Sequence, residues 1–158
     1  MIAIKVKIKD KIQRRLILME EKKYFTFLSC NKCVGSNGSE FIGVSTMVKL
    51  SNFKQKEANG SQLTTARARI ANRSNVLSSV LGETIVPDEY GNVWVDVTFW
   101  GDKSERINKY IGDRETARVF LVGTMTSRTY VKEDGTTGIG VTIRATDWAS
   151  AENHRNAE

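Results

Sequence analysis

The chain has 158 residues, which is enough for one domain with a hydrophobic core and its extensions. Hydrophobic residues make up 40% of it and charged residues 27%, a composition that is typical of globular proteins and excludes a disordered chain. The longest aliphatic run near the start, LILM at residues 16–19, is too short for a signal peptide or a membrane span. The sequence therefore predicts a cytoplasmic protein with no membrane partner.

The formal net charge of +6 is concentrated at the start of the chain. Residues 1–23 contain eight Lys or Arg against three Asp or Glu, a net charge of +5, so the remainder is nearly neutral. A basic balance favours nucleic acid or another anionic surface as a partner, although proteins that bind neither can also be basic. Any anion-binding face outside this basic segment must therefore be local.

Three short strand-like runs open the chain: IAIKVKIK at 2–9, RRLILM at 14–19 and KYFTFLS at 23–29. With the Gly- and Ser-rich turn VGSNGSE that follows, we interpret residues 1–40 as a basic β extension. The first run alternates apolar residues with lysines: Ile2, Ile4, Val6 and Ile8 against Lys5, Lys7 and Lys9. Such a strand must pair with a sheet edge, its own or a neighbouring subunit's, and we favour a neighbour and hence a homo-oligomer.

The extension also holds a CNKC motif, Cys30 to Cys33, while His154 near the end is the only histidine. A zinc site needs four ligands, so these residues cannot complete one within a single chain. A redox pair would need a helix N-terminus, whereas Gly35 and Gly38 favour a loop. We therefore expect two ordinary thiols in a turn, no metal, no cofactor and no small-molecule substrate. A single histidine also argues against Ser/His/Asp or Cys/His catalysis, so we expect no enzyme.

The main domain is predicted over residues 41–148, followed by a flexible polar tail at 149–158. Alternation predicts strands at 41–50, 63–73, 93–100, 117–131 and 138–148. Residues 74–92, which contain the only proline, are interpreted as a long mobile connection or a distorted hairpin. One helix is predicted over 101–113, where Ile107, Tyr110 and Ile111 have helical spacing. This order predicts an all-β protein, a five-stranded OB-fold barrel with one short helix between the third and fourth strands.

The strand VWVDVTFW, residues 93–100, raises the question of what its second face does. Val93, Val95, Val97 and Phe99 form an ordinary core face, whereas Trp94, Asp96, Thr98 and Trp100 point the other way. Alternation gives Arg67 and Arg69 the parity to share this second face and, if no bulge intervenes in their strand, Phe120, Arg128 and Tyr130 as well. One tryptophan alone could lie at a subunit interface or beneath a loop. Aromatic rings interleaved with guanidinium groups predict instead a site for single-stranded nucleic acid, whose bases stack while its phosphates meet cations.

The segment VWVDVTFWGDKSERINKYIGDRETARVFLVGTMTSRTYVKEDG, with RARIANR before it, resembles the central half of bacterial single-stranded DNA-binding proteins. The resemblance covers residues 41–148 and is strongest from 93 to 135. It implies stacking of bases on four aromatic residues, Trp94, Trp100, Phe120 and Tyr130. It also implies that Arg128 and Arg73 lie near the DNA backbone. The protein is then expected to coat single-stranded DNA, with little sequence preference, in replication, transfer or recombination.

The chain also departs from the family pattern. Val95 stands where the family often has a histidine at a subunit contact, which argues against the usual tetramer, and Val76 falls near an expected aromatic position. The chain stops at HRNAE, without the acidic, apolar tip of housekeeping members, so we expect a divergent relative from a plasmid, phage or other mobile element. Two alternatives stay open. They are an OB-fold module that binds a protein partner in a replication complex, and a binder of single-stranded RNA.

Overall fold

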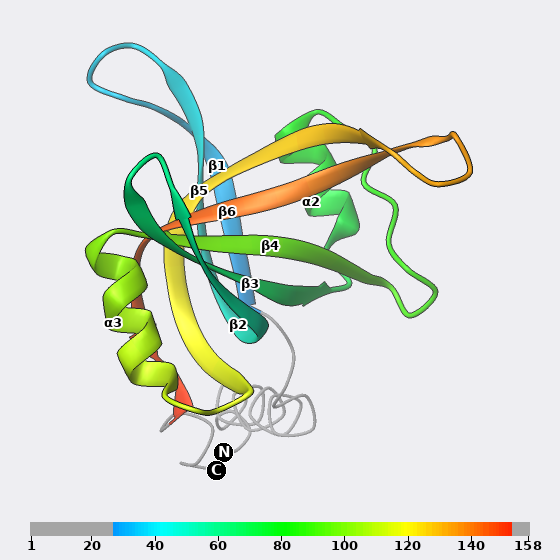
Figure 1. Ribbon diagram of the computed structural model, residues 1–158. Coiled ribbons are helices and arrows are strands. Elements are labelled where there is room, and N and C mark those ends of the chain that lie inside the picture. The colour runs from blue at the N-terminus through cyan, green and yellow to red at the C-terminus, as the bar shows by residue number, and fades with distance from the viewer. Residues whose placement is uncertain (1–26, 153–158) are drawn as a thin grey trace, which may run out of the picture. The chain divides into compact units, whose positions relative to one another are not determined.

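The computed structural model describes residues 27–152 (Figure 1). The expectations for the basic alternating strand, for His154 and for the last six residues lie outside the described residues. The elements in chain order are β1 (Phe27–Val34), β2 (Glu40–Ala58), β3 (Ser61–Ala71), α2 (Ser74–Leu81), β4 (Asn92–Trp100), α3 (Asp102–Ile111), β5 (Thr116–Val131) and β6 (Thr137–Ser150). Between residues 27 and 152, no helix has the length and apolar character needed to span a membrane.

Five of the strands form a closed sheet. Its order is β2–β3–β4–β6–β5, and β5 pairs again with β2 to complete the ring. Within this ring only the β4–β6 pairing is parallel, and α3 lies in the chain between β4 and β5, the third and fourth of these five strands in sequence order. This is the arrangement of an OB fold, so the predicted fold class is confirmed.

Strand β2 closes the ring because it pairs with two other strands of the ring, β5 and β3, over successive parts of its length. Its residues from Ile42 to Ser51 pair with β5, and those from Leu50 to Ala58 pair with β3. The register shifts between Ser51 and Lys54, where Asn52 has a φ of 54°. Asparagine tolerates this left-handed conformation, and the resulting bulge bends the strand from one partner to the other.

A second irregularity lies in the pairing of β5 with β6, between Val122 and Gly123 of β5. A Cβ atom on Gly123 would lie 2.2 Å from the backbone oxygen of Arg144 on β6. Only glycine therefore allows the two strands to approach this closely at the bulge.

The core fills the interior of the closed sheet. The predicted alternation in β4 holds, with Val93, Val95, Val97 and Phe99 all buried. Helix α3 is confirmed where a helix was expected (Figure 1), and its buried Ile107 belongs to the same hydrophobic cluster. The opposite face of β4 is thereby left outside the core.

Helix α2 shows that the interpretation of residues 74–92 as a mobile connection or distorted hairpin is wrong for its first part. Leu77 is fully buried, and Val80 and Leu81 pack against the core at i+3 and i+4. Gly82 ends the helix in the left-handed conformation, with a φ of 70°, and its N–H bonds the carbonyl of Ser78. The apolar spacing and the terminal glycine are ordinary helix signals that the proline downstream obscured.

Strand β1 belongs to the described sheet, although it lies within the segment 1–40 that was interpreted as an extension. It pairs antiparallel with β2, from Phe27 opposite Met47 to Val34 opposite Glu40. At the other end of the chain, β6 continues to Ser150, two residues into the predicted tail. The next residue, Ala151, is buried.

Cys30 and Cys33 lie in β1, so the expectation that they sit in a turn is wrong. Residues three apart in a strand point to opposite faces, which separates the two sulfurs. Cys30 packs against the core, and burial raises the pKa of its thiol, whereas the Sγ of Cys33 donates to Asn31 Oδ1. Both thiols are free, and the described residues contain no group of three or more His, Cys, Asp or Glu that could hold a metal ion.

Candidate nucleic-acid interface

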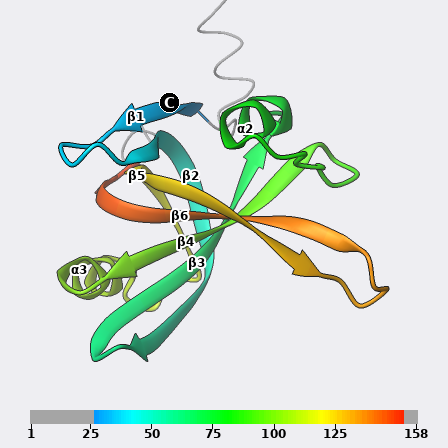
Figure 2. The ribbon, with the colours of Figure 1, turned by 90° about the horizontal axis from the view of Figure 1, so that it is seen from above.

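A groove opens where β4 and β6 separate. The two strands pair over only four positions, Val95–Thr98 with Val141–Arg144. Past Val95 and Val141 the pairing ends, and the β5–β6 hairpin extends beyond the closed sheet (Figure 1, Figure 2). The groove has a volume of about 520 Å³, and the loop between α2 and β4, residues 85–88, forms a further part of its wall. It therefore lies beside the outer face of β4.

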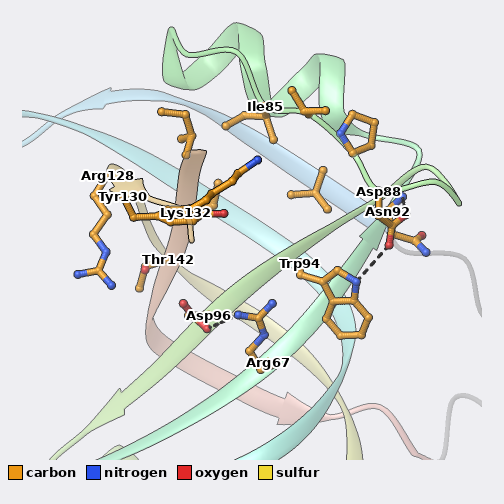
Figure 3. Close-up of a pocket in the computed structure, with 16 residues that line it drawn as sticks. Arg67, Ile85, Asp88, Asn92, Trp94, Asp96, Arg128, Tyr130, Lys132 and Thr142 are labelled. Atoms are coloured by element: carbon orange, nitrogen blue, oxygen red, sulfur yellow. Dashed lines mark hydrogen bonds and ion pairs between the residues drawn. The ribbon is translucent and has the colours of Figure 1, made fainter. Parts of the chain in front are cut away.

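Aromatic and charged side chains converge on this groove from two sides (Figure 3). Strands β3 and β4 and the loop before β4 supply one set: Arg67, Asp88, Trp94 and Asp96. The β5–β6 hairpin supplies the other: Arg128, Tyr130 and Lys132. Trp94 is 44% exposed and Tyr130 is 45% exposed, so each ring keeps surface for a ligand. The second and third strands and the loop between the fourth and fifth are the parts of an OB fold that bind oligonucleotides.

The indole of Trp94 is held by the loop that precedes its strand. Its Nε1–H donates to Asp88 Oδ2 at 3.3 Å, while Asp88 Oδ1 accepts the N–H groups of Tyr90 and Asn92, each at 2.9 Å. These bonds, that of the Asn92 amide above all, hold the pKa of the Asp88 carboxyl below its usual value. Asp88 therefore ties the loop and the ring together before any ligand arrives.

The guanidinium group of Arg67 contacts both Trp94 and Asp96. Its Nη1 donates to Asp96 Oδ1 at 3.1 Å, and its guanidinium carbon lies 5.7 Å from the centre of the Trp94 ring. The register explains both contacts. Arg67 is directly opposite Asp96, and it is the diagonal neighbour of Trp94, which is itself opposite Arg69. The outer face of β3 and β4 thus alternates cations, an indole and a carboxylate.

Tyr130 lies against the backbone of β6 on the hairpin side of the groove. It pairs with Gly138, where a Cβ atom would lie 2.8 Å from Cζ and Oη of the tyrosine ring. A Cβ atom on Gly140 would lie 3.7 Å from Tyr130 Cδ1. The ring therefore extends across both glycines, which fixes one of its faces and leaves the other outward.

A second aromatic and cation pair lies at the other end of β4. Trp100 is half-buried, and the guanidinium carbon of Arg144 on β6 lies 5.1 Å from the centre of its ring. Arg144 pairs with Thr98 in the parallel ladder, so it belongs to the same outer face. Neither Arg144 nor Lys132 was among the site residues predicted from the sequence. Alternation along β6 could have identified Arg144, whereas Lys132 follows the end of β5 and has no such signal.

The other predicted site residues lie outside the groove. Arg69 is exposed on β3 and its charge helps to lower the pKa of Asp88, after the hydrogen bonds of that carboxyl. Arg73 is the residue before α2, and its Nη1 donates to the carbonyl of Asn72 at 3.0 Å. Phe120 is 41% exposed on β5 at the position that pairs with Met47 of β2. The predicted DNA contacts of these three residues stay predictions.

The net charge around the groove is small. Residues 27–152 contain fifteen Lys or Arg and fourteen Asp or Glu, a net charge of +1. Arg67, Arg128 and Lys132 line the groove together with the carboxylates of Asp88 and Asp96. Attraction of an anionic ligand to this part of the chain therefore depends on where the individual cations lie.

No protein-family model and no curated protein matches the sequence. Solved structures similar to this chain include three single-stranded DNA-binding proteins. The mitochondrial single-stranded DNA-binding protein Rim1 of S. cerevisiae has 14% identity and a TM-score of 0.43, over 71% of this chain and 96% of that one. The second single-stranded DNA-binding protein of Mycobacterium smegmatis, SSBb, has 14% identity and a TM-score of 0.39, over 83% and 92%. A small single-stranded DNA-binding protein of Streptomyces coelicolor has 11% identity and a TM-score of 0.42, over 81% and 96%.

Proposed function

We propose that the protein binds single-stranded DNA, largely independently of sequence and without catalysing a reaction. The observation that carries this proposal is the half-exposed indole of Trp94 beside Arg67, facing a groove whose other side holds Tyr130 and Arg128. Bases stack on such rings through π faces that every base has, while cations contact the phosphates. A duplex hides these faces, so the groove favours unpaired strands.

The biological setting follows from the same proposal. A protein that coats single strands serves replication, transfer or recombination of DNA in the cytoplasm, and a divergent sequence fits a mobile element. We also propose that several copies assemble along one strand of DNA as a homo-oligomer. The support for this assembly is the alternating apolar and basic pattern of residues 2–9. Two alternatives to DNA are a protein partner and single-stranded RNA. The first experiment must distinguish them from binding of single-stranded DNA.

Titration of the intrinsic tryptophan fluorescence tests the function directly. Single-stranded DNA, single-stranded RNA and duplex DNA of equal length should be compared at the same salt concentration. We expect saturable quenching by single-stranded DNA and much weaker quenching by the duplex, because only unpaired bases can stack on Trp94. Tighter binding of RNA would support the RNA alternative. No response to any of the three would favour a protein partner.

The cations are expected to contact phosphates, and the salt dependence of binding measures such contacts. Arg128→Ala should weaken binding to all sequences alike and reduce the slope of log affinity against log salt by about 0.7. The same change is predicted for Arg67, Arg69 and Arg73. Lys109→Ala on α3, which removes one charge outside the groove, is the matched control and should leave the slope unchanged. An unchanged slope in all four arginine variants would contradict phosphate contact.

A further inference from the structure

Two carboxylates flank Trp94 on a surface proposed to bind a polyanion. Asp88 has a structural role, because both of its oxygens hold the loop and the indole. Asp96 is different: its side chain is 46% exposed, and its hydrogen bond to the described part of the chain uses Oδ1 alone. Its Oδ2 is thus available to accept a hydrogen bond from a ligand in the groove, and Oδ1 keeps a second lone pair that can accept another.

The carboxylate of Asp96 determines which part of a nucleotide can approach it. Phosphates are repelled by a like charge and are drawn instead to Arg128 and Lys132 on the hairpin side of the groove. Trp94 and Asp96 are two residues apart on the same face of β4, about 7 Å along the strand. A base that stacks on the indole therefore presents its edge, and not its phosphate, to Asp96.

A carboxylate only accepts hydrogen bonds, so the base edge must donate them. Guanine offers two adjacent donors on its Watson–Crick edge, N1–H and the N2 amino group, which match the two oxygens of a carboxylate. Adenine and cytosine offer one amino group each, and thymine offers one N–H between two carbonyl oxygens that a carboxylate repels. Single strands expose these edges, whereas duplexes pair them.

We propose that Asp96, oriented by Arg67, reads the Watson–Crick edge of the base stacked on Trp94 and prefers guanine. The preference rests on the proposed function. It adds one position at which the base is recognised to a site that otherwise binds any sequence. The bond from Arg67 Nη1 holds Oδ1 in place, and it leaves Oδ2 and the second lone pair of Oδ1 to accept the two donors of guanine. Thr142 of β6 is opposite Asp96 and also lines the groove, so it lies beside the proposed base position on the β6 side.

Single strands that differ in one base test this preference. The probes are thymidine oligomers of about fifteen nucleotides, a length that fills one OB-fold site, with thymine, guanine, inosine, adenine or cytosine at the centre. We expect the guanine probe to bind about tenfold more tightly than the all-thymine probe, as a bidentate base contact does. Inosine lacks only the N2 amino group of guanine, so it should lose most of this gain.

Two variants of Asp96 and one control complete the experiment. Asp96→Asn and Asp96→Ala should abolish the guanine preference and raise affinity for the all-thymine probe, because the repulsion of the strand is removed. Asp102→Asn on α3, a matched loss of one negative charge outside the groove, should preserve the preference.

The outcomes distinguish this inference from the function on which it rests. If the wild-type protein binds all five probes equally, the base preference is wrong while single-strand binding stands. If the guanine preference survives in both Asp96 variants, the base is read elsewhere and the inference is overturned. If the wild-type protein binds no probe, the proposed function and the preference fail together.

Discussion

Trp94→Ala is expected to weaken binding of single-stranded DNA by about 1–3 kcal/mol, the loss that follows removal of one base-stacking ring. The ring is 44% exposed beside the groove, and the core on the other face of β4 does not depend on it. The thermal unfolding midpoint should therefore stay close to the wild-type value. Fluorescence of a labelled oligonucleotide, which does not require the protein's own tryptophans, measures the affinity.

Trp94→Phe is the matched control, because it keeps an aromatic face and removes only the bond to Asp88. It should retain most of the affinity. Trp100→Ala is predicted to lose about 1–3 kcal/mol as well, since its ring and Arg144 share the outer face of the sheet. Normal binding by the alanine variants, or a large loss of their stability, would contradict the assignment of this face.

Val97→Asp should unfold the domain. Val97 has an exposed fraction of 0% and lies in the closed sheet between Ala66 of β3 and Ile143 of β6. An ionised carboxyl at this position has no partner in the core, and burying it costs several kcal/mol. A domain of this size has a total stability of only about 5–15 kcal/mol. Circular dichroism during heating and in urea is the measurement.

The neighbouring residue provides the control for this second variant. Thr98→Asp introduces the same charge one position along β4, on the outer face opposite Arg144. This variant should remain folded, although it would weaken DNA binding through repulsion of phosphates. A cooperative unfolding transition of Val97→Asp near that of the wild type would show that the two faces of β4 have been assigned incorrectly.

The central strand was predictable because one physical rule determines it. Successive side chains in a strand alternate between faces, so the valines at 93, 95 and 97 had to share a core if the segment was a strand at all. The same rule placed Trp94 and Trp100 outside that core. The helix α3 was equally clear, since Ile107 and Ile111 repeat at helical spacing.

The groove could not be predicted from the sequence, because it depends on where two pairings end. Alternation gives Tyr130 and Phe120 the same parity, yet it does not reveal that β5 changes partners along its length. Tyr130 lies in the part that pairs only with β6, and Phe120 lies in the part that also pairs with β2. Parity along the strand therefore places Phe120 and Tyr130 on the outer face of the sheet, where both are exposed. It does not predict where around the ring each residue lies.

Asp88 illustrates a second limit. Its role depends on hydrogen bonds to Tyr90, Asn92 and Trp94, which form only after the loop has folded back toward β4. In the sequence this residue follows the single proline of an irregular segment, and nothing distinguishes it from an ordinary turn aspartate. Arg144 differs, because alternation along β6 puts it on the outer face, and only its pairing with Trp100, 44 positions earlier in the chain, has no signal in the sequence.

The short parallel ladder between β4 and β6 has a mechanical consequence. Its four paired positions join the two strands only next to the core, so the rest of the hairpin is a two-stranded arm supported at one end. A change in the angle of this arm would move Tyr130 and Arg128 relative to Trp94 without disturbing any buried residue of β4. The width of the groove and the stability of the domain are thus separate properties, and the site can adapt to bases of different size while the ring stays intact.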